Sequence, residues 1–372
     1  MTTRTACCLC GGDPGTLTDD AFELKGFPIC GAPAVSPFEA DVRADLNFCS
    51  CRRCGTVQLR NLVDPRILYG SAHNSTTHSA TWRAHHAAFA DFCQRAGLAF
   101  HTHLVEVGGA SGVLARLLAD GFDHYNIIDL AEQDESLRHM TRVSFTRGNC
   151  EVCDLPCDGA VIMSHVFEHL YNPRAFVANC ASKGVSDIIL SIPDMEDACK
   201  KGVVPIHAEH TFYVDERSMA AVFGSSGYSV AARENFRRHS LFMHFTRQGG
   251  VRDDDAFDSP DKRAALVIGT LESRRARASN LNIPDGAFVA PAGLFGQALA
   301  YYASGSEGIA GFLDNDPCKQ GKRVYGHPHT VYPLDRIAEA GPVTVYVSAG
   351  PYTEEIAAQL REVNALVNVV RV

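Results

Sequence analysis

The chain has 372 residues, of which 46% are hydrophobic, so it is long enough for two or three domains with buried cores. Its formal net charge is −9 and it has no long basic segment, which argues against the clustered Lys and Arg that a nucleic-acid surface needs. No apolar stretch approaches the roughly 20 residues that span a bilayer, and the first residues lack the apolar core of a signal peptide. We therefore expect a cytoplasmic protein that binds neither nucleic acid nor membrane.

Two Cys-x-x-Cys pairs near the N-terminus predict a metal site in a module that spans residues 1–60. Cys7 and Cys10 form the first pair and Cys51 and Cys54 form the second, with a glycine directly after each pair. Four thiolates surround a tetrahedral ion with no open position, which is the pattern of a structural Zn²⁺ site. The other cysteines among the 14 are interpreted as reduced thiols, because a cytoplasmic chain rarely keeps disulfides.

The segment 61–255 is expected to form a second, larger domain. A helical pattern covers about 79–96, where Trp82, Phe89 and Phe92 recur on one face. Strand patterns then alternate with helical ones, and the strand patterns read HLVEVGG, HYNIIDL, GAVIMSHV and SDIILSIP. Strands that alternate with helices predict an α/β fold with a parallel, doubly wound sheet.

A third unit is expected over residues 256–372, after an acidic join that reads VRDDDAFDSPDKR. The segments GAFVAPAGLFGQALAYYA and VTVYVSAGPYTEEIAAQLREV each read as a strand, a turn and a helix. This order predicts a C-terminal Rossmann-like domain, although its turn APAGLFG is only loosely glycine-rich.

A glycine-rich turn at residues 105–115, VEVGGASGVLA, joins a predicted strand to a predicted helix. Glycines at such a turn let a ligand approach the backbone, and the helix N-terminus offers unpaired N–H groups. Glu106 stands inside the strand, where a carboxylate suits a ligand with a cationic amino group. Asp129 ends the next strand about 20 residues further on, where it can accept both hydroxyls of a ribose.

These features favour S-adenosylmethionine over a dinucleotide as the cofactor. The pyrophosphate fingerprint G-x-G-x-x-G is absent, because the glycines of this turn are spaced differently. S-adenosylmethionine carries a ribose and an α-amino acid but no pyrophosphate. Its amino group would match the acid inside the first strand, Glu106, and its ribose would match the acid at the end of the next strand, Asp129. The predicted cofactor-binding residues are Glu106, Gly108, Gly109, Gly112, Asp129, Asn149 and His165.

The order of a cysteine module, a methyltransferase-type sheet and a Rossmann-like tail resembles the sugar C-methyltransferases of deoxysugar biosynthesis. The resemblance covers nearly the whole chain and rests on the segments CRRCGTVQL, VEVGGASGVLA, SHVFEHLYNP, HAEHTFY and FLDNDPCKQGKRVYG. It implies a class I methyltransferase fold for the central domain and a C-terminal domain that binds the substrate. It also implies an enzyme that uses S-adenosylmethionine, holds structural Zn²⁺ and methylates a nucleotide-diphosphate sugar beside its carbonyl.

The resemblance also points to particular residues in the substrate half. Glu209 and His210 match the family's Tyr-x-Glu-His stretch, and His169 falls where the family has a histidine after the fourth strand. The family tyrosine is replaced by His207, and Asn74 stands near the position of a second expected tyrosine. We therefore expect an ordinary cofactor half and an altered substrate half.

The stretch IHAEHTFY, residues 206–213, is interpreted as a proton-transfer site. A carbon beside a ketone becomes nucleophilic only when its α-proton is removed, and histidine has the pKa best matched to that task near neutral pH. We expect His210 to be the base and Glu209 to orient it or to bind a sugar hydroxyl. His207 or His169 would donate a hydrogen bond to the developing oxyanion.

Other interpretations of the same residues stay open. The stretch could bind a metal, although its spacing differs from HExxH, or it could be a satisfied cluster without chemistry. The chain could instead be an O- or N-methyltransferase on a sugar or small natural product, or a non-catalytic zinc and nucleotide-binding protein. The basic residues that could bind a diphosphate are Lys200–Lys201, Arg237–Arg238 and Lys319–Arg323.

Overall fold

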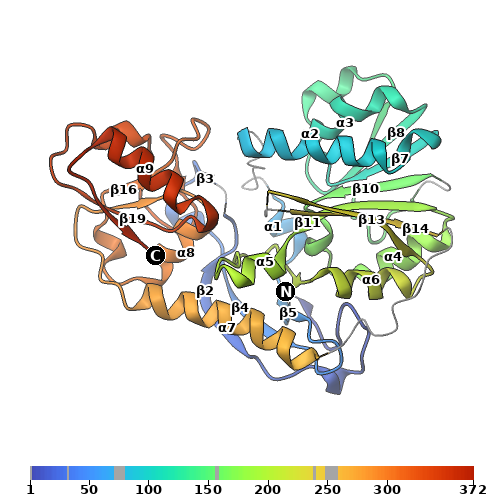
Figure 1. Ribbon diagram of the computed structural model, residues 1–372, viewed down its shortest axis with the longest axis horizontal. Helices are drawn as coiled ribbons and strands as arrows, with labels where there is room; N and C mark the ends of the chain where they lie inside the picture. Colours follow the sequence, from blue (N-terminus) through green and yellow to red (C-terminus); the bar gives the residue numbers. More distant parts are fainter. Residues whose placement is uncertain (1, 32, 71–79, 156–158, 238–239, 248–258) are drawn as a thin grey trace.

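The computed structural model describes residues 2–31, 33–70, 80–155, 159–237, 240–247 and 259–372. The main elements form three groups: a central seven-stranded sheet, a C-terminal five-stranded sheet and a set of N-terminal strands. In Figure 1 the N-terminal strands lie with α7 below the other two groups. Across the described ranges, every helix falls short of the length or the apolar character that crossing a membrane requires. Asn74 lies outside these ranges. The predicted division after residues 60 and 255 stays a prediction.

The N-terminal sheet recruits a strand from the middle of the chain. Its antiparallel order is β12-β5-β4-β2, with β2 (Phe22–Pro28), β4 (Arg43–Ser50), β5 (Val57–Leu59) and β12 (Phe212–Tyr213). Along β4 the side chains of Ala44, Leu46 and Phe48 are buried, whereas those between them are not, as in a strand with one face on a core. Because β12 directly follows the stretch HAEH, the sheet ties that stretch to the cysteine module.

The central sheet has the strand order β13-β14-β11-β10-β7-β8-β9. Its strands are β7 (His103–Val107), β8 (His124–Asp129), β9 (Val143–Arg147), β10 (Ala160–Ser164), β11 (Asp187–Pro193), β13 (Ser229–Phe236) and β14 (Ser240–Thr246). The five strands β7 to β11 run parallel to one another, whereas β14 is antiparallel to both of its neighbours. The predicted doubly wound sheet is confirmed, and β14 makes it mostly rather than wholly parallel.

Helices cover both faces of this sheet (Figure 1). The helices of the segment are α1 (Pro65–Leu68), α2 (Ala80–Arg95), α3 (Val113–Leu118), α4 (Pro173–Ser182), α5 (Met195–Lys200) and α6 (Glu216–Gly224). Successive residues of β7 point to opposite faces: Leu104 packs in the cluster under α2 and α3, and Val105 packs in the cluster under α4 and α6. Burial on both faces explains the near-continuous apolar strand sequences.

The C-terminal sheet is parallel throughout, in the order β18-β16-β15-β19-β20. Its elements are β15 (Phe288–Ala290), β16 (Gly311–Leu313), β18 (Val331–Tyr332), β19 (Thr344–Val347), β20 (Asn368–Arg371), α8 (Leu294–Tyr302) and α9 (Thr353–Val363). The strand order reverses between β15 and β19. The carboxyl edge at this switch point is where open α/β sheets bind ligands.

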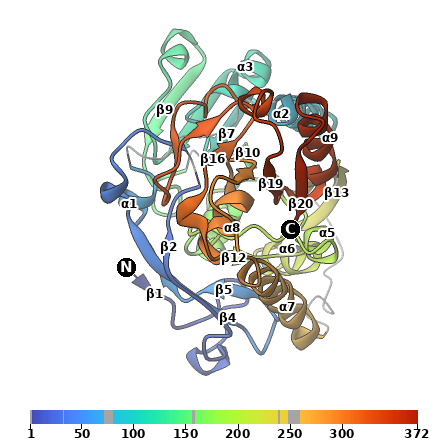
Figure 2. The ribbon, with the colours of Figure 1, turned by 90° about the vertical axis from the view of Figure 1, so that its left-hand side faces the viewer.

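A long helix that the sequence analysis did not anticipate, α7 (Pro260–Ser279), follows the acidic join. It contacts β2 and β5 of the N-terminal sheet as well as α5 and α8 (Figures 1 and 2). Its sequence, PDKRAALVIGTLESRRARAS, presents a narrow apolar stripe among charges, and only Thr270, Leu271 and Ala278 are buried. The helix therefore links all three groups of elements.

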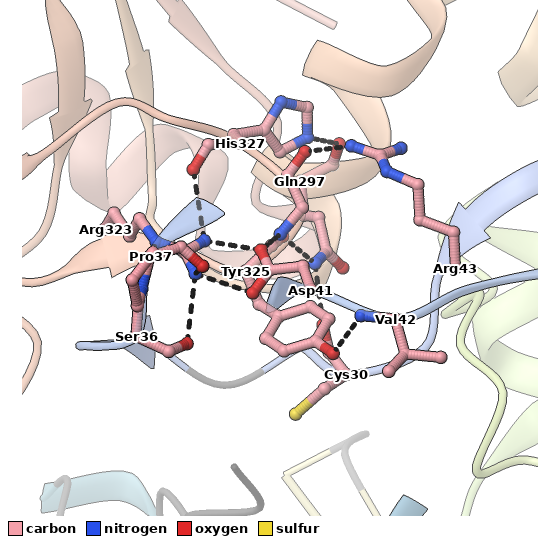
Figure 3. A network of polar contacts seen from close by, with 11 residues as sticks. Cys30, Ser36, Pro37, Asp41, Val42, Arg43, Gln297, Arg323, Tyr325 and His327 are labelled. Atoms are coloured by element: carbon pink, nitrogen blue, oxygen red, sulfur yellow. Dashed lines mark hydrogen bonds and ion pairs between the residues drawn. The ribbon is translucent and has the colours of Figure 1, made fainter. Parts of the chain in front are cut away.

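The N-terminal residues also dock directly on the C-terminal unit (Figure 3). Arg323 lies on β17 (Arg323–Val324), which pairs with β3 (Pro33–Ala34), and its Nη2 donates to Oδ1 of Asp41 at 2.6 Å. Nε2 of Gln297 donates to the carbonyl oxygens of Cys30 and Tyr325 at 2.7 and 2.6 Å. The side chain of Asp41 is 1% exposed, so this ion pair belongs to a buried interface.

Candidate active site

The four predicted metal ligands come together at the N-terminus. The sulfur atoms of Cys7, Cys10, Cys51 and Cys54 all lie within 4.8 Å of one another, and two of the pairs, 7 with 54 and 10 with 51, are 3.6 Å apart. A tetrahedron with Zn–S bonds of about 2.3 Å has edges of about 3.8 Å, so the arrangement fits such an ion.

The glycine after each cysteine pair has the backbone that the spacing predicts. The two glycines have φ values of +61° and +74°, and each N–H donates to the carbonyl oxygen of the first cysteine of its pair. Only glycine adopts this conformation without strain, and it turns the chain back so that both thiols face one point.

A cavity of about 1100 Å³ opens at the carboxyl ends of the central parallel strands. The glycine-rich turn, the end of β8 and the loop after β9 form one side of it. The loop after β10 and the stretch HAEH form another side. Gly31, Leu294, Phe295 and Tyr352 reach it from the N-terminal and C-terminal units. All three groups of elements therefore contribute to one cavity.

Glu106 is the buried acid of the cofactor side. It is 4% exposed on β7, and its Oε2 accepts a 2.7 Å hydrogen bond from the hydroxyl of Tyr125. Burial raises the pKa of Glu106 to about 7. A cationic ligand group beside this carboxyl would favour its ionised form, so the residue fits the amino group that the sequence analysis assigned to it.

The other predicted cofactor residues lie around Glu106 in different ways. Gly108 has a φ of +80° and faces the cavity, whereas Gly109 and Gly112 are not among the residues that line it. A side chain at Gly109 would collide with the carboxyl of Glu106, whose nearest atom would lie 2.3 Å from the added Cβ. Gly109 is therefore required by packing against Glu106.

Asp129, Asn149 and His165 all line the cavity. Oδ2 and Oδ1 of Asp129 accept hydrogen bonds from the backbone N–H groups of Ala110 and Ala131, both at 2.8 Å. These bonds hold the carboxylate at the mouth of the glycine-rich turn. Its second lone pairs can still accept a ribose hydroxyl.

His165 stands between the two sides of the cavity. It directly follows β10 with an unusual φ of +53°, and its backbone N–H donates to the carbonyl of Ser191. Its ring lies 5.0 Å from that of Trp82, its Nε2 is 2.8 Å from Oγ of Ser240, and burial lowers its pKa to about 3. The structure thus places this predicted cofactor residue close to the substrate side as well.

The predicted catalytic histidines converge on the substrate side. The ring centroids of His207 and His210 are 3.9 Å apart, those of His169 and His210 are 5.2 Å apart, and all three rings line the cavity. Burial, together with the neighbouring histidines, lowers the pKa of His210 well below its usual value. His210 is therefore a neutral imidazole near pH 7, which is the form that accepts a proton.

The N-terminal sheet holds these histidines together. The carbonyl of Thr211 accepts from the N–H of Leu59 on β5, while the N–H of Thr211 donates to the carbonyl of Glu168 in the loop after β10. The guanidinium of Arg4, which is 7% exposed, donates to the hydroxyl of Thr211 at 2.9 Å and to the carbonyl of Tyr171 at 2.9 Å. The loop of His169 and the loop of His210 are thereby fixed side by side.

Glu168 is a site residue that the sequence analysis did not select. It is 2% exposed, and its Oε1 lies 3.3 Å from Nδ1 of His165 and 3.9 Å from Nε2 of His210. Burial raises its pKa to about 7. Glu209 lies 3.8 Å from His169 and 4.0 Å from His207, so the acid that faces Nε2 of His210 is Glu168. Only the pairing of two distant loops reveals this partner.

Glu168, His169 and His210 also satisfy a geometric condition for a metal site, with ligand atoms within 4.8 Å of one another. Ligands of a tetrahedral ion with bonds of about 2.1 Å lie about 3.4 Å apart, which is closer than the 3.9 Å between His210 and Glu168. The hydroxyl of Tyr69 lies 3.1 Å from Nδ1 of His169. At 3.9 Å the carboxyl of Glu168 and the ring of His210 are also beyond hydrogen-bond distance, so this spacing alone does not choose between coordination and proton transfer.

The strand order of the central sheet, with its antiparallel strand β14 next to β11, is that of the class I S-adenosylmethionine-dependent methyltransferase fold. The chain has this fold, and its glycine-rich turn and cavity lie where proteins of the class hold the cofactor. No protein-family model matches the sequence, and no curated protein matches it.

Solved structures of similar fold are methyltransferases. Magnesium protoporphyrin IX methyltransferase from Synechocystis PCC 6803, with bound SAH, is 18% identical over 49% of this chain and 92% of that chain, with a TM-score of 0.36. N-methyltransferase NodS from Bradyrhizobium japonicum WM9 is 12% identical over 46% of this chain and 90% of the NodS chain, with a TM-score of 0.37. A methyltransferase from Mesorhizobium loti is 14% identical over 46% of this chain and 100% of that chain, with a TM-score of 0.36. Because these scores lie below 0.5, we take the fold from the strand order itself.

Proposed function

We propose that the protein is an S-adenosylmethionine-dependent C-methyltransferase that acts on a nucleotide-linked keto-sugar. One observation carries the proposal: three histidines and Glu209 line the same cavity as Glu106 and Asp129, and the buried Glu168 lies 3.9 Å from one of these histidines, His210. A cofactor site alone would indicate methyl transfer in general. A neutral, buried imidazole that faces a carboxyl adds the means to remove a proton from carbon.

The cofactor side fits S-adenosylmethionine by its chemistry. When bound, this cofactor supplies an electrophilic methyl group on a sulfonium. Glu106 would hold its amino group, Asp129 its ribose hydroxyls, and the open backbone at Gly108 would let it approach the turn. Tyr125 keeps the carboxyl of Glu106 oriented through their 2.7 Å hydrogen bond.

In the proposed reaction His210 removes the α-proton of the keto-sugar. Its Nδ1 accepts the proton, the electron pair of the broken C–H bond forms the enolate, and Nε2–H points toward Glu168 at 3.9 Å. The ionised form of Glu168 stabilises the imidazolium that results, as the acid of a catalytic triad does. His207 or His169 would donate a hydrogen bond to the enolate oxygen, and the cofactor, when bound, would supply the methyl group to the enolate carbon and leave as S-adenosylhomocysteine.

Proton exchange tests this proposal against the alternative of an O- or N-methyltransferase. In D₂O, with S-adenosylhomocysteine bound in place of the methyl donor, the enzyme should exchange the α-proton of a nucleoside-diphosphate 4-keto-6-deoxysugar, which mass spectrometry detects. A heteroatom methyltransferase has no reason to remove that proton. If the enzyme transfers a methyl group but does not exchange the α-proton when S-adenosylhomocysteine is bound, it is not a C-methyltransferase. Absence of methyl transfer to any keto-sugar would favour a non-catalytic protein.

We further propose that Cys7, Cys10, Cys51 and Cys54 hold one structural Zn²⁺. The four thiols leave no open position for a substrate or water, and they lie at the end of the sheet that carries β12. The ion would thus support the loop of His210 through β5 and β12 without taking part in the reaction.

A further inference from the structure

A second, smaller cavity of about 160 Å³ lies between α7, α8 and the turn after β19. Arg274 and Arg277 of α7 line it together with Tyr302 of α8. It shares the wall residues Lys201, Val203 and Phe295 with the large cavity. The two cavities are therefore neighbours.

The two arginines of this cavity have no acidic partner. Among the described residues, no carboxylate lies within ion-pair distance of Arg274 or Arg277. Arg274 donates to the carbonyl of Val204 and lies 4.6 Å above the ring of Phe295, and Arg277 donates to the carbonyl of Gly202 at 3.4 Å. Burial, and the charge of Arg277, lower the pKa of Arg274 to about 10.

Two neighbouring cations without a counter-ion are unfavourable, above all for Arg274, which is partly buried, whereas Arg277 is exposed. They are also unexpected in a protein whose net charge is −9. Four of the basic residues considered in the sequence analysis are neutralised instead: Lys200 by Glu196, Lys201 by Asp197, Lys319 by Asp314 and Arg323 by Asp41. An anion in the small cavity would relieve the repulsion between Arg274 and Arg277.

The cavity has further groups that suit an anion. Ser348, Gly350 and Thr353 lie at the carboxyl edge of β19, beside the switch point of the C-terminal sheet. Within the described part of the chain, the buried hydroxyl of Tyr302 has no hydrogen-bond partner, and burial raises its pKa, which keeps it a donor.

We propose that this cavity binds a phosphate or diphosphate group, with Arg274, Arg277 and the hydroxyl of Tyr302 as its donors. Planar guanidinium groups match phosphate oxygens well, because they can donate two parallel hydrogen bonds to them. The identity of that group rests on the proposed function, in which it is the diphosphate of the nucleotide-linked sugar. A sugar attached to this diphosphate would lie next to the large cavity, because the two cavities share Lys201, Val203 and Phe295.

Calorimetric titration of the intact protein with uridine diphosphate, thymidine diphosphate and inorganic pyrophosphate tests this site. Arg274→Gln and Arg277→Gln should each weaken the binding of these anions about tenfold or more, because each removes a charge-assisted hydrogen bond. Tyr302→Phe should weaken it severalfold. Tighter binding of a nucleoside diphosphate than of pyrophosphate identifies the nucleotide-linked source, and equal binding identifies a free diphosphate.

Arg275→Gln is the matched control. Arg275 is the next residue on the same helix, but its guanidinium lies 4.7 Å from the ring of Phe22 and faces the N-terminal sheet. Its loss should leave anion binding within twofold of the unaltered protein. Affinity for S-adenosylmethionine, measured on all variants, shows that they fold.

Equal anion affinity of Arg274→Gln, Arg277→Gln and the unaltered protein would overturn the site, as would the absence of any binding. Failure of the proposed function is a separate result. Arginine-dependent nucleotide binding without methyl transfer would remove only the C-methyltransferase. Methyl transfer whose KM is unchanged in Arg274→Gln would remove only the anion site.

Discussion

Oε1 of Glu168 lies 3.9 Å from Nε2 of His210, although the two residues come from different loops and are held together by the N-terminal sheet. The same oxygen lies 3.3 Å from Nδ1 of His165. One buried carboxyl therefore faces two histidines, at the point where the cofactor side and the substrate side of the cavity meet.

Glu168→Gln should lower kcat roughly 10- to 100-fold and leave KM nearly unchanged. The amide keeps the shape of the carboxyl but cannot stabilise an imidazolium. Because burial raises the pKa of Glu168 to about 7, kcat of the unaltered enzyme should rise with pH through about 7 as this group ionises. The variant should lack that rise. Glu234→Gln, which alters an exposed partner of Arg95, is the control. If kcat of Glu168→Gln depends on pH as in the unaltered enzyme, Glu168 does not stabilise the imidazolium of His210.

His210→Ala should lower methyl transfer roughly 100-fold or more and abolish α-proton exchange in D₂O, because the substitution removes the proposed base. Titration with S-adenosylhomocysteine should give the affinity of the unaltered protein. His139→Ala, at an exposed position outside the cavity, should change neither readout. Exchange that persists at full rate in His210→Ala would show that another group is the base.

Glu106→Gln should stabilise the ligand-free protein at alkaline pH. The folded-state pKa of Glu106 is raised from 4.5 to about 7, so its contribution to stability is complete below pH 4.5 and is lost as pH rises through 7. The unaltered protein should therefore lose up to about 3 kcal/mol relative to the variant between pH 4.5 and pH 8. Urea denaturation at several pH values measures this difference.

The same variant should bind S-adenosylmethionine at least about tenfold more weakly, because an amide cannot pair with its ammonium group. Glu132→Gln, an exposed residue beside Arg147, serves as the control for both measurements. If the free energy of unfolding changes with pH in the same way for Glu106→Gln and the unaltered protein, burial does not raise the pKa of this carboxyl.

Cys51→Ser should remove the proposed Zn²⁺ and reduce activity as well as stability. Elemental analysis should find one zinc per chain in the unaltered protein and little in the variant. Loss of a structural zinc site costs several kcal/mol, and here it would loosen the sheet that anchors Thr211 and so displace His210. Cys318→Ser, at an exposed position, should leave metal content and melting temperature unchanged. A metal-free protein with full activity would refute this link.

Local patterns in the sequence were sufficient for the elements whose geometry is local. The Cys-x-x-Cys spacing with its following glycine predicts a knuckle because the required backbone lies within a few residues. Gly108 and Glu106 are recognisable for the same reason, since the strand, the turn and the helix are contiguous. Alternation of apolar strands with helices is enough to predict the doubly wound sheet.

The tertiary structure decided which distant residues meet. Glu168 beside His210, β12 in the N-terminal sheet, and Arg274 with Arg277 at the C-terminal switch point all depend on contacts between separate elements. No local pattern marks them, because a carboxylate in a loop or an arginine on a charged helix looks like any solvated residue. Which of them is buried, and against which partner, follows only when the sheets and α7 are packed together. By itself the sequence determined the fold class and the cofactor turn, and the packing of three units determined the chemistry of the cavity.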